Sequence, residues 1–278
     1  MNENQSVQLQ QILNSSSYTL AERDIDFLAR SELRPVRMQL ELLKPEMALV
    51  EYRIESTIVC FGGTQVVERE AAQQRVAVAE KLVKEKPDCP ASRRKLDRAR
   101  RLLAKAGFYD HAREFAHIAS KHSEKTSHRE YVIVTGGGPG IMEAANRGAF
   151  DVNAKSIGLN ITLPHEQVPN SYITPELCFQ FHYFALRKMH FLLRAKALVV
   201  FPGGFGTLDE LFDALTLRQT GKLQKIPIIL FGRAYWNKAV DFQFLADEGV
   251  IADADLDLIS YAETAQEAWD AIVAFPTE

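Results

Sequence analysis

One glycine-rich segment has the residue types and spacing to hold a phosphate group. Gly203, Gly204, Gly206 and Thr207 immediately precede a helical run at 208–220. Glycine lets backbone N–H groups approach an anion closely, and the positive end of the following helix adds to the attraction. The hydroxyl and the N–H of Thr207 supply further donors. The sequence therefore predicts a phosphate-binding loop, although glycines that only form tight turns would give the same pattern.

Two further glycine-rich segments, 62–64 and 136–140, also follow short apolar runs. In open α/β sheets the ligand crevice lies beyond the carboxyl ends of the strands. Three glycine-rich segments on one edge of a sheet favour a phosphorylated ligand over three unrelated turns.

Charged residues lie on both sides of the predicted phosphate-binding loop. Glu210 falls on the third or fourth residue of the helix that follows the loop, so its side chain can turn back to the loop. Asp209 and Asp213 are on the same first turns, where an acid also stabilises the helix dipole by about 0.3–1 kcal/mol. Arg187 and Lys188, upstream, could clamp a phosphate. By themselves such paired cations are more often a solvated helix face.

Short β-branched runs, each followed by a helical stretch, precede these segments. Continuous apolar strands that alternate with helices indicate a parallel sheet covered on both faces. The sequence therefore predicts an α/β fold: a doubly wound, Rossmann-like parallel sheet with helices on both faces and a helical N-terminal extension. The predicted strands are Thr57–Phe61, Tyr131–Val134, Ser156–Leu163, Ala197–Phe201, Ile226–Phe231 and Leu256–Tyr261, and a closing helix is predicted around Ala265–Ala274.

Composition excludes several classes of protein. The chain of 278 residues has a net charge of −3, so the whole molecule is not a polyanion binder. Cys60, Cys89 and Cys178 form no CxxC pair and argue against a disulfide framework or a structural zinc site. The first residues show no signal peptide, and no apolar run approaches the roughly 18–20 residues that cross a bilayer. We expect a cytoplasmic protein without membrane contacts.

Familiar nucleotide and metal fingerprints do not fit this sequence. GxxxxGK[ST] and GxSxG are absent, and Ile141 stands where the third glycine of GxGxxG would be. His165-Glu166 lacks the second histidine of HExxH, and the acidic run 253–257 is not followed by the Gly and Glu of a calcium loop. We therefore expect no protein-bound metal.

The segment 91–105 carries seven Lys and Arg residues against Asp97 alone. A nucleic-acid-binding patch would have this composition. Because the segment has no interleaved aromatics and the chain is acidic overall, we prefer a solvated helix face in an insertion between the first two strands.

The glycine segments resemble the motifs of a known family. Residues 202–210, PGGFGTLDE, are similar to the PGGxGTxxE motif of the LONELY GUY (LOG) family, and Arg187-Lys188 matches the RK pair that precedes it. Residues 136–144, GGGPGIMEA, resemble the family's GGGxxGxM loop. The resemblance runs from about Thr57 to the C-terminus. Many such proteins carry the label "lysine decarboxylase", but nothing in this sequence suggests a pyridoxal-phosphate lysine site.

The resemblance implies a cytokinin riboside 5′-monophosphate phosphoribohydrolase. Such an enzyme cuts the N-glycosidic bond of a nucleoside 5′-monophosphate such as AMP and releases the free base and ribose 5-phosphate. The resemblance also implies a homodimer or a larger assembly of dimers, and no redox cofactor. The sequence departs from the family at Phe184-Ala185-Leu186, where short members have Met-His-Glu, and at Phe61-Gly62-Gly63-Thr64, where Cys-Gly-Ser-Ser is usual. Because these positions bear on the base pocket, we expect a general purine or pyrimidine monophosphate nucleosidase.

The matched motifs imply a role for each candidate residue. Glu210 would face the sugar, stabilise positive charge on the ribose and align or deprotonate water. Arg187 would position the nucleotide and help the leaving base, with Lys188 assisting electrostatically, and these three are the expected catalytic residues. The expected substrate-binding residues are Gly203, Gly204, Gly206 and Thr207 at the 5′-phosphate, Gly137, Gly138 and Met142 on the opposite wall, Gly63 and Thr64 on the floor, and Asp213.

The predicted organisation is a helical extension at 1–52 and a Rossmann-like nucleotide-binding catalytic domain at 53–278. We read the extension as a cap on the core, with a partner-binding arm as the alternative. Two other functions stay open: a non-catalytic nucleotide or molybdopterin carrier on the same fold, and a nucleic-acid-binding module that uses 93–105. Glu210 favours catalysis, because a carrier needs the glycine cradle but no carboxylate at the sugar.

Overall fold

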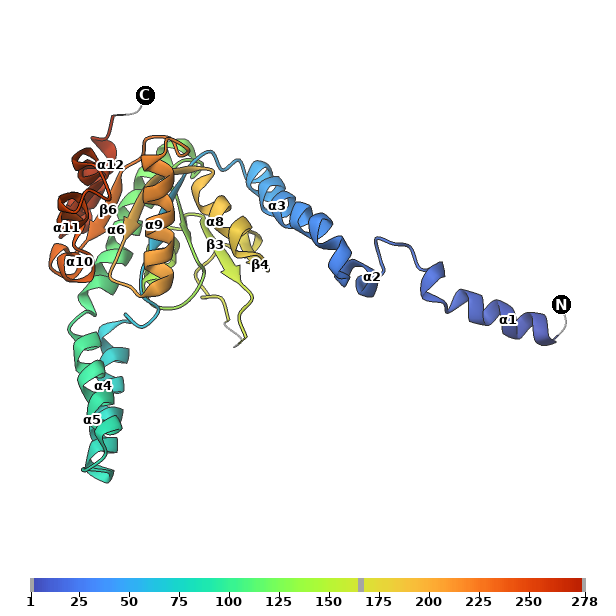
Figure 1. Ribbon diagram of the computed structural model, residues 1–278, viewed down its shortest axis with the longest axis horizontal. Coiled ribbons are helices and arrows are strands. Elements are labelled where there is room, and N and C mark those ends of the chain that lie inside the picture. Colours follow the sequence, from blue (N-terminus) through green and yellow to red (C-terminus); the bar gives the residue numbers. More distant parts are fainter. Residues whose placement is uncertain (1–2, 165–167, 277–278) are drawn as a thin grey trace. The chain divides into compact units, whose positions relative to one another are not determined.

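The computed structural model describes residues 3–164 and 168–276 and contains two compact units, Met1–Glu46 and Met47–Glu278 (Figure 1). His165 and Glu166, which the sequence excludes as an HExxH site, lie outside the described residues. Among the residues that are described, no helix combines the length and the apolar character needed to span a membrane. The predicted division into domains after residue 52 stays a prediction.

The first unit is a series of helices with little burial. Asp24 caps α2 by accepting a hydrogen bond from the N–H of Phe27 at 2.9 Å. Arg37 of α3 donates a hydrogen bond to the carbonyl of Leu28 at 2.6 Å, which ties α3 to α2. Among the described residues before 45, no large hydrophobic side chain is buried. The elements are α1 (Glu3–Leu13), the 3₁₀ turn η1 (Ser16–Tyr18), α2 (Ile25–Ala29), the 3₁₀ turn η2 (Ser31–Leu33) and most of α3 (Arg34–Glu51).

The second unit is built on one seven-stranded sheet, in the order β4-β3-β2-β1-β5-β6-β7 across the described residues. Every neighbouring pair is parallel, and Val59 of β1 lies between Val134 of β2 and Leu198 of β5. The chain winds outward from β1 to β4 and then returns to the other side of β1 with β5, which confirms the doubly wound fold. The strands are β1 (Thr57–Phe61), β2 (Val132–Thr135), β3 (Ser156–Ile161), β4 (Cys178–Phe181), β5 (Ala195–Val200), β6 (Ile228–Phe231) and β7 (Ile259–Ala262).

One strand was not predicted and another begins later than predicted, each for a local reason, whereas the ends of the other strands lie within two residues of their predicted positions. The strand β4 was not predicted, because its residues, CFQF, include no β-branched side chain and directly follow the 3₁₀ turn η4 (Pro175–Leu177). The predicted strand at 256–261 is wrong in its first half, where the 3₁₀ segment η5 (Asp253–Leu258) forms instead. Asp255 accepts a hydrogen bond from the N–H of Ala252 at 2.9 Å and so favours this helical turn.

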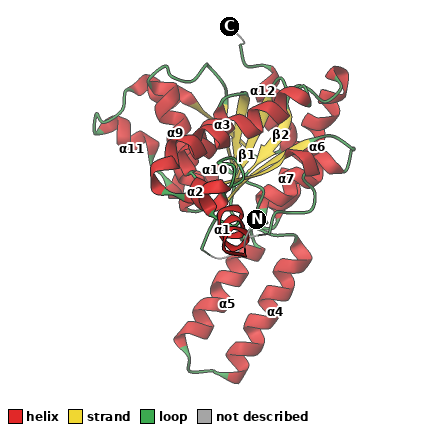
Figure 2. Ribbon diagram, turned by 90° about the vertical axis from the view of Figure 1, so that its right-hand side faces the viewer, coloured by secondary structure: helices red, strands yellow, loops and turns green. Residues whose placement is uncertain are grey.

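Helices cover both faces of the sheet, because successive strand residues point to opposite sides. On β1, Ile58 and Cys60 belong to one core and Val59 and Phe61 to the other. Residues of α6, α7 and α12 complete the core around Ile58, and residues of α3 and α8 to α11 complete the other core (Figure 2). The prediction of helices on both faces is thus confirmed. Their bounds are α6 (Gly107–Ser123) with the 3₁₀ turn η3 (Glu124–Thr126), α7 (Ile141–Phe150), α8 (Phe184–Leu192), α9 (Phe205–Gln219), α10 (Arg233–Ala239), α11 (Phe242–Asp247) and α12 (Ala265–Val273).

A helical hairpin is inserted between β1 and β2. Its helices, α4 (Arg69–Glu85) and α5 (Pro90–Leu103), pack against each other and extend away from the sheet (Figure 2). Small side chains, Ala72 and Ala79 of α4 and Ala99 of α5, are buried in the hairpin. The basic segment at 91–105 therefore forms α5 and the residues directly after it.

Candidate active site

The three glycine-rich loops meet at one edge of the sheet. β2, β1 and β5 are adjacent and parallel, so the loops that follow them leave from the same edge. The chain changes direction of winding between β1 and β5, and open α/β sheets bind ligands at such a switch point. A cavity of about 340 Å³ lies there. Its walls include the predicted site residues Gly63, Thr64, Met142, Arg187, Gly204, Gly206, Thr207 and Glu210.

The β5–α9 loop ends in a helix N-terminus with free backbone donors. The first intrahelical hydrogen bond of α9 runs from the N–H of Leu208 to the carbonyl of Gly204 at 3.0 Å. The N–H groups of residues 204–207 consequently have no acceptor within the helix. Together with the helix dipole they form a wall suited to an anion. α9 begins at Phe205, three residues before the predicted start, which brings the last glycine of the loop into its first turn.

Two glycines of this loop contribute in different ways. A Cβ at Gly203 would overlap the Thr207 side chain, so the close approach of loop and helix requires glycine there. A Cβ at Gly204 would meet nothing within 4 Å, which leaves open space at the cavity wall. The Tyr235 hydroxyl of α10 donates a hydrogen bond to the carbonyl of Gly203 at 2.5 Å and holds the loop in place.

Glu210 places a buried carboxylate on the wall of the cavity. It lies three residues after Thr207, so both side chains are on the same face of α9. Its side chain is nearly buried, and Oε1 lies 3.8 Å from Nη1 of Arg187. Burial raises the pKa of Glu210 to about 7, although the positive charges of Arg187 and Lys188 oppose this rise. A carboxyl group that titrates near neutral pH in a cavity is typical of a general acid or base.

Arg187 is held rigidly beside Glu210. Its Nε donates a hydrogen bond to the carbonyl of Leu159 in β3 at 2.7 Å, and its Cζ lies 5.1 Å from the centroid of the Phe191 ring. Burial lowers the pKa of Arg187, and the charge of Glu210 acts in the opposite direction. A guanidinium stays protonated at neutral pH, so a fixed positive charge faces the cavity. A Cβ at Gly136 would lie 2.5 Å from Nη2 of Arg187, so the β2 loop makes room for this side chain.

The loop after β2 forms the opposite wall only in part. Gly137 has a φ of +74°, and its N–H donates a hydrogen bond to the Thr135 hydroxyl at 3.0 Å. Asn170 donates hydrogen bonds from Nδ2 to the carbonyls of Gly137 and Gly138 at 3.2 and 3.1 Å. The N–H of Gly137 is therefore used inside the loop. Among the predicted residues of this segment, Met142 lines the cavity, whereas Gly137 and Gly138 do not.

A network of buried hydrogen bonds supports the loop after β2. The Thr135 hydroxyl donates to Oδ1 of Asn146 at 2.7 Å, and Nδ2 of Asn146 donates to the Ser156 hydroxyl at 3.0 Å. Asn170 donates to the same Asn146 oxygen at 3.0 Å. These residues join β2, α7, β3 and the segment before η4. Sequence reasoning missed Asn146 and Asn170, because no local pattern marks residues that meet only in the folded sheet.

Direct backbone hydrogen bonds link the three loops. The N–H of Gly63 donates to the carbonyl of Pro202 at 2.9 Å, and the carbonyl of Gly63 accepts from the N–H of Ile141 at 3.3 Å. Gly140 has a φ of +73°, and a Cβ there would lie 2.5 Å from the Gly63 carbonyl oxygen. The floor and both walls of the cavity are consequently one connected backbone structure.

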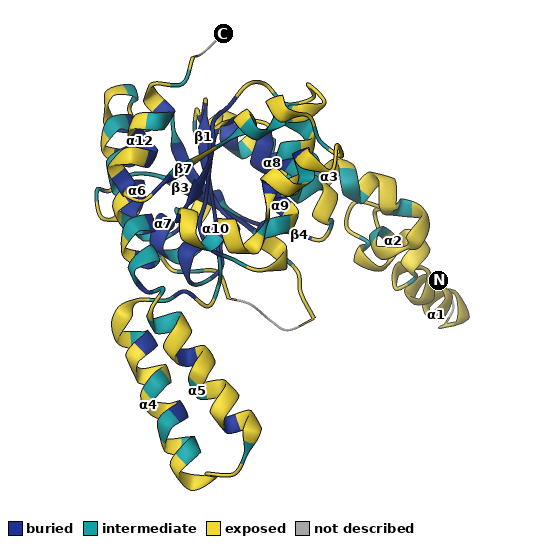
Figure 3. Ribbon diagram, turned by 60° about the vertical axis from the view of Figure 1, so that its left-hand side comes forward, coloured by how far each residue is buried: buried dark blue, intermediate teal, exposed yellow. Residues whose placement is uncertain are grey.

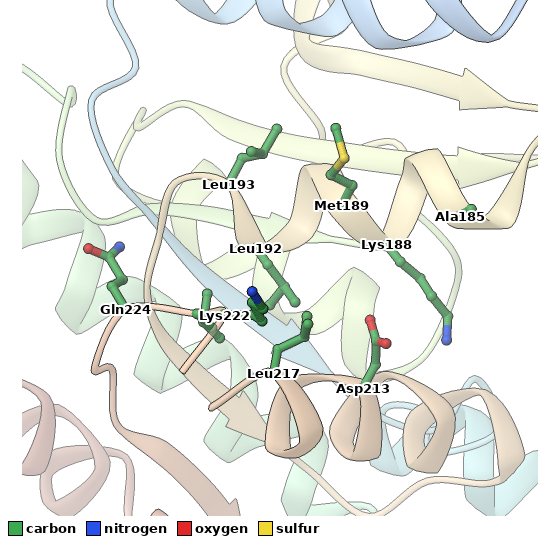
Figure 4. Close-up of a pocket in the computed structure, with 10 residues that line it drawn as sticks. Ala185, Lys188, Met189, Leu192, Leu193, Asp213, Leu217, Lys222 and Gln224 are labelled. Atoms are coloured by element: carbon green, nitrogen blue, oxygen red, sulfur yellow. The ribbon is translucent and has the colours of Figure 1, made fainter. Parts of the chain in front are cut away.

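Lys188 and Asp213 line a second cavity, of about 590 Å³, between α8 and α9 (Figure 4). Nζ of Lys188 donates a hydrogen bond to Oδ1 of Asp209 at 2.8 Å. Burial lowers the pKa of Lys188, but the hydrogen bond to Asp209 and the charges of Glu210 and Asp213 outweigh this effect and raise it. Lys188 thus lies beside the cavity of Glu210, and its charge still lowers the pKa of Glu210.

Two exposed aromatic residues on the cavity wall, Phe184 and Phe205, were not among the expected substrate-binding residues, although Phe184 lies in a segment expected to bear on the base pocket. Phe205, the first residue of α9, is 92% exposed, and Phe184, the first residue of α8, is 49% exposed. Exposed aromatic faces beside a polar loop can stack on a planar ring. Phe205 lies inside the PGGFGT segment, so the glycines on either side of it mark its position.

The fold and the site define a Rossmann-like α/β protein with a glycine-rich loop suited to an anion and a buried carboxylate at the switch point. Residues 142–272 match the family model described as "Possible lysine decarboxylase". This segment runs from α7 into α12 and includes Glu210, so this part of the chain is similar to that family. The relatives below carry LOG names, so the resemblance to the LOG family is confirmed.

The curated relatives align with about half of this chain. A protein of Oryza sativa subsp. japonica, "Probable cytokinin riboside 5'-monophosphate phosphoribohydrolase LOGL3", is 28% identical over 147 residues, 50% of this chain and 66% of its own. "Cytokinin riboside 5'-monophosphate phosphoribohydrolase LOG4" of Arabidopsis thaliana is 30% identical over 144 residues, 50% of this chain and 65% of its own. The chain therefore spans about two thirds of the length of these relatives.

Solved structures show partial similarity to this chain. The molybdenum cofactor binding protein of the phototrophic bacterium Rippkaea orientalis has a TM-score of 0.47 at 15% identity, over 79% of this chain and 96% of its own. The Moco carrier protein of Chlamydomonas reinhardtii has a TM-score of 0.47 at 18% identity, over 79% of this chain and 96% of its own.

Proposed function

We propose that this protein is a nucleoside 5′-monophosphate phosphoribohydrolase. Water adds to the anomeric carbon of the ribose, the N-glycosidic bond breaks, and the free base and ribose 5-phosphate are released. One observation carries the proposal: the buried carboxyl group of Glu210, with a pKa of about 7, lies one helical turn from a helix N-terminus suited to a phosphate. The names of the LOG relatives support the same class of reaction.

The 5′-phosphate would bind at the N-terminus of α9. The N–H groups of Gly204, Gly206 and Thr207 supply donors, and the helix dipole supplies a partial positive charge. The open space at Gly204 and Gly206, where a Cβ would meet nothing within 4 Å, lets an anion approach the backbone. Binding through the backbone fixes the ribose close to the next turn of α9.

Glu210 would act on the ribose and on water. Breaking a glycosidic bond develops positive charge on the sugar ring, and a carboxylate at the ring stabilises that charge. The same carboxylate would accept a proton from the attacking water. Because its pKa is about 7, Glu210 can take up this proton near neutral pH and return it to the departing base, which is then released as the neutral free base.

Arg187 would orient the nucleotide and stabilise the negative charge that develops on the leaving base. The hydrogen bond to the carbonyl of Leu159 fixes its guanidinium before substrate arrives. Lys188 would act at longer range, because its Nζ is bonded to Asp209 and its charge favours the ionised form of Glu210.

The base would lie against the exposed aromatic residues Phe184 and Phe205. Stacking on an aromatic face contributes about 1–3 kcal/mol per base and tolerates every base, since each has a flat face. We therefore propose a nucleosidase for purine or pyrimidine monophosphates, AMP included, rather than an enzyme restricted to cytokinin nucleotides.

Lysine decarboxylation, which the family description names, fits this cavity poorly. Pyridoxal phosphate is held in its enzymes as a Schiff base on a lysine amine. Among the described residues no lysine lines the cavity of Glu210. The nearby Lys188 is engaged with Asp209 and faces the second cavity.

The decisive experiment offers the full chain a panel of nucleotides: AMP, GMP, CMP, UMP and a cytokinin riboside 5′-monophosphate. Free base and ribose 5-phosphate are measured by chromatography. Glu210→Gln keeps the shape of the side chain, so it should bind nucleotide and lose turnover by roughly 10²–10⁴-fold. Glu85→Gln, on the exposed surface of α4, is the matched control and should keep full turnover.

Two outcomes would contradict the proposal. Nucleotide binding without release of any base would identify a non-catalytic nucleotide or pterin carrier. Hydrolysis by Glu210→Gln at the wild-type rate would remove this residue from the reaction.

A further inference from the structure

Charge is distributed very unevenly along this chain. Residues 69–105, which contain the α4–α5 hairpin, include twelve Lys and Arg and five Asp and Glu, a net charge of +7. Residues 239–278 include ten Asp and Glu and no Lys or Arg. The whole chain has a net charge of −3. Each copy of the protein therefore carries one strongly basic and one strongly acidic segment.

The exposed side of α5 carries what we call the basic stripe: Arg94, Lys95, Arg98 and Arg101. Three of these are spaced i, i+4 and i+7, so they lie on one face of the helix. All four are exposed, and the hairpin that carries them extends into solvent (Figure 3). No salt bridge between described residues involves the stripe, whereas Arg100 of the same helix pairs with Glu80 at 3.0 Å.

The matching surface is what we call the acidic patch: Asp247, Glu248, Asp253 and Asp257. The first two lie at the end of α11, and the other two lie on η5, which contacts α11. All four are exposed. Within the described part of the chain, no salt bridge neutralises any of them.

We propose that the basic stripe of one copy docks on the acidic patch of a second copy of this chain. Both surfaces are exposed and opposite in charge, neither has an ionic partner among the described residues of its own copy, and one contact between copies satisfies both. Every copy carries both surfaces, so a twofold axis would form the contact twice. This proposal is independent of the reaction at Glu210.

A membrane or a nucleic acid as the partner of the basic stripe would explain fewer of these observations than a second copy does. Along the hairpin, residues 69–105, Val78 is the single large hydrophobic side chain that is exposed, so there is no apolar face to enter a membrane. A nucleic acid would use the same cations but would leave the acidic patch unexplained. The negative charge of the remaining chain would also repel a polyanion.

Sedimentation velocity of the full chain tests the contact at about 50 mM and about 500 mM salt. The wild type should associate at low salt and dissociate at high salt, because exposed charges are screened. R94E/R98E/R101E should raise the dissociation constant about 10- to 100-fold, as should E248R/D253R/D257R. Combining the two triple variants restores opposite charges and should restore association.

A matched control reverses three exposed lysines of the same hairpin, outside the stripe: K81E/K84E/K86E. This variant has the same change in net charge and should associate like the wild type. The proposal is wrong if the wild type is monomeric in all conditions, if the stripe variant associates normally, or if the combined variant does not recover. Salt-dependent binding of duplex DNA or RNA, lost in the stripe variant while association is unchanged, would identify nucleic acid as the occupant instead.

Discussion

Replacing Glu210 by glutamine should stabilise the protein at alkaline pH while lowering the proposed turnover by roughly 10²–10⁴-fold. Burial raises the pKa of Glu210 from its ordinary value of 4.5 to about 7. The folded state therefore binds this proton more tightly than the unfolded chain. Stability falls as the pH rises from about 4.5 to about 7, and the full loss is present above pH 7. A pKa difference of this size corresponds to about 3 kcal/mol.

An amide in place of the carboxyl group cannot ionise, so Glu210→Gln removes this loss. The free energy of unfolding should exceed that of the wild type by up to about 3 kcal/mol at about pH 8, and by little at about pH 4. For a folded unit of this size the gain corresponds to roughly 6–12 °C in Tm. At neutral pH, Glu210 lowers the free energy of unfolding. Such a loss of stability is characteristic of a residue kept for chemistry rather than for folding.

The assay is urea unfolding followed by fluorescence and circular dichroism at both pH values. Glu85→Gln, at an exposed position, should show no pH-dependent difference from the wild type. A Glu210→Gln protein that is less stable than the wild type at about pH 8 would refute the reasoning. It would mean that the ion pair with Arg187, at 3.8 Å, stabilises the charge more than burial penalises it.

Three further predictions concern the site. The pKa of Glu210 predicts that kcat/KM rises about tenfold for each unit of increasing pH below neutrality and levels off above a pH of about 7. A flat profile from about pH 5 to 8 would speak against Glu210 as the base. Thr207→Val removes a hydroxyl at constant volume and should weaken nucleotide binding about tenfold or more by calorimetry, since a hydrogen bond to a charged group contributes about 1.5–3 kcal/mol. Unchanged affinity would take the hydroxyl out of the phosphate site. Asn170→Ala removes the donor to Gly137, Gly138 and Asn146 and should cost about 1–3 kcal/mol in unfolding free energy and raise KM; wild-type stability would show that the network does not support the loop.

The sequence predicts best those parts of the site that are contiguous in the chain. Gly203 to Glu210 occupy one loop and the first turns of one helix, so their spacing already brings the glycine-rich loop and the carboxylate together. Arg187 and Lys188 show the limit of this reasoning. Adjacent residues on a helix point about 100° apart, and the structure accordingly places Arg187 in one cavity and Lys188 in the other.

Other parts of the site depend on contacts that no local pattern specifies. Asn146 and Asn170 are brought together because β2 and β3 are neighbours in the sheet, and strand order is not written in the pattern of apolar runs. The edge strand β4 is short and alternates buried and exposed residues, so it lacks the continuous apolar run that marks β1. The parallel sheet itself was predictable because its central strands are buried on both faces.

The hydrogen bonds from Gly63 to Pro202 and from Ile141 to Gly63 have a consequence for how such a protein can change over time. These bonds join main-chain atoms, so the backbone framework of the three loops is kept when the side chains around it are exchanged. Phe184 and Phe205 line the cavity, and their side chains take no part in these backbone hydrogen bonds, so they can be replaced without breaking them. At the proposed site, a lineage could thus acquire a preference for a different base through mutations at these two positions, while the backbone of the proposed phosphate-binding loop stays unchanged.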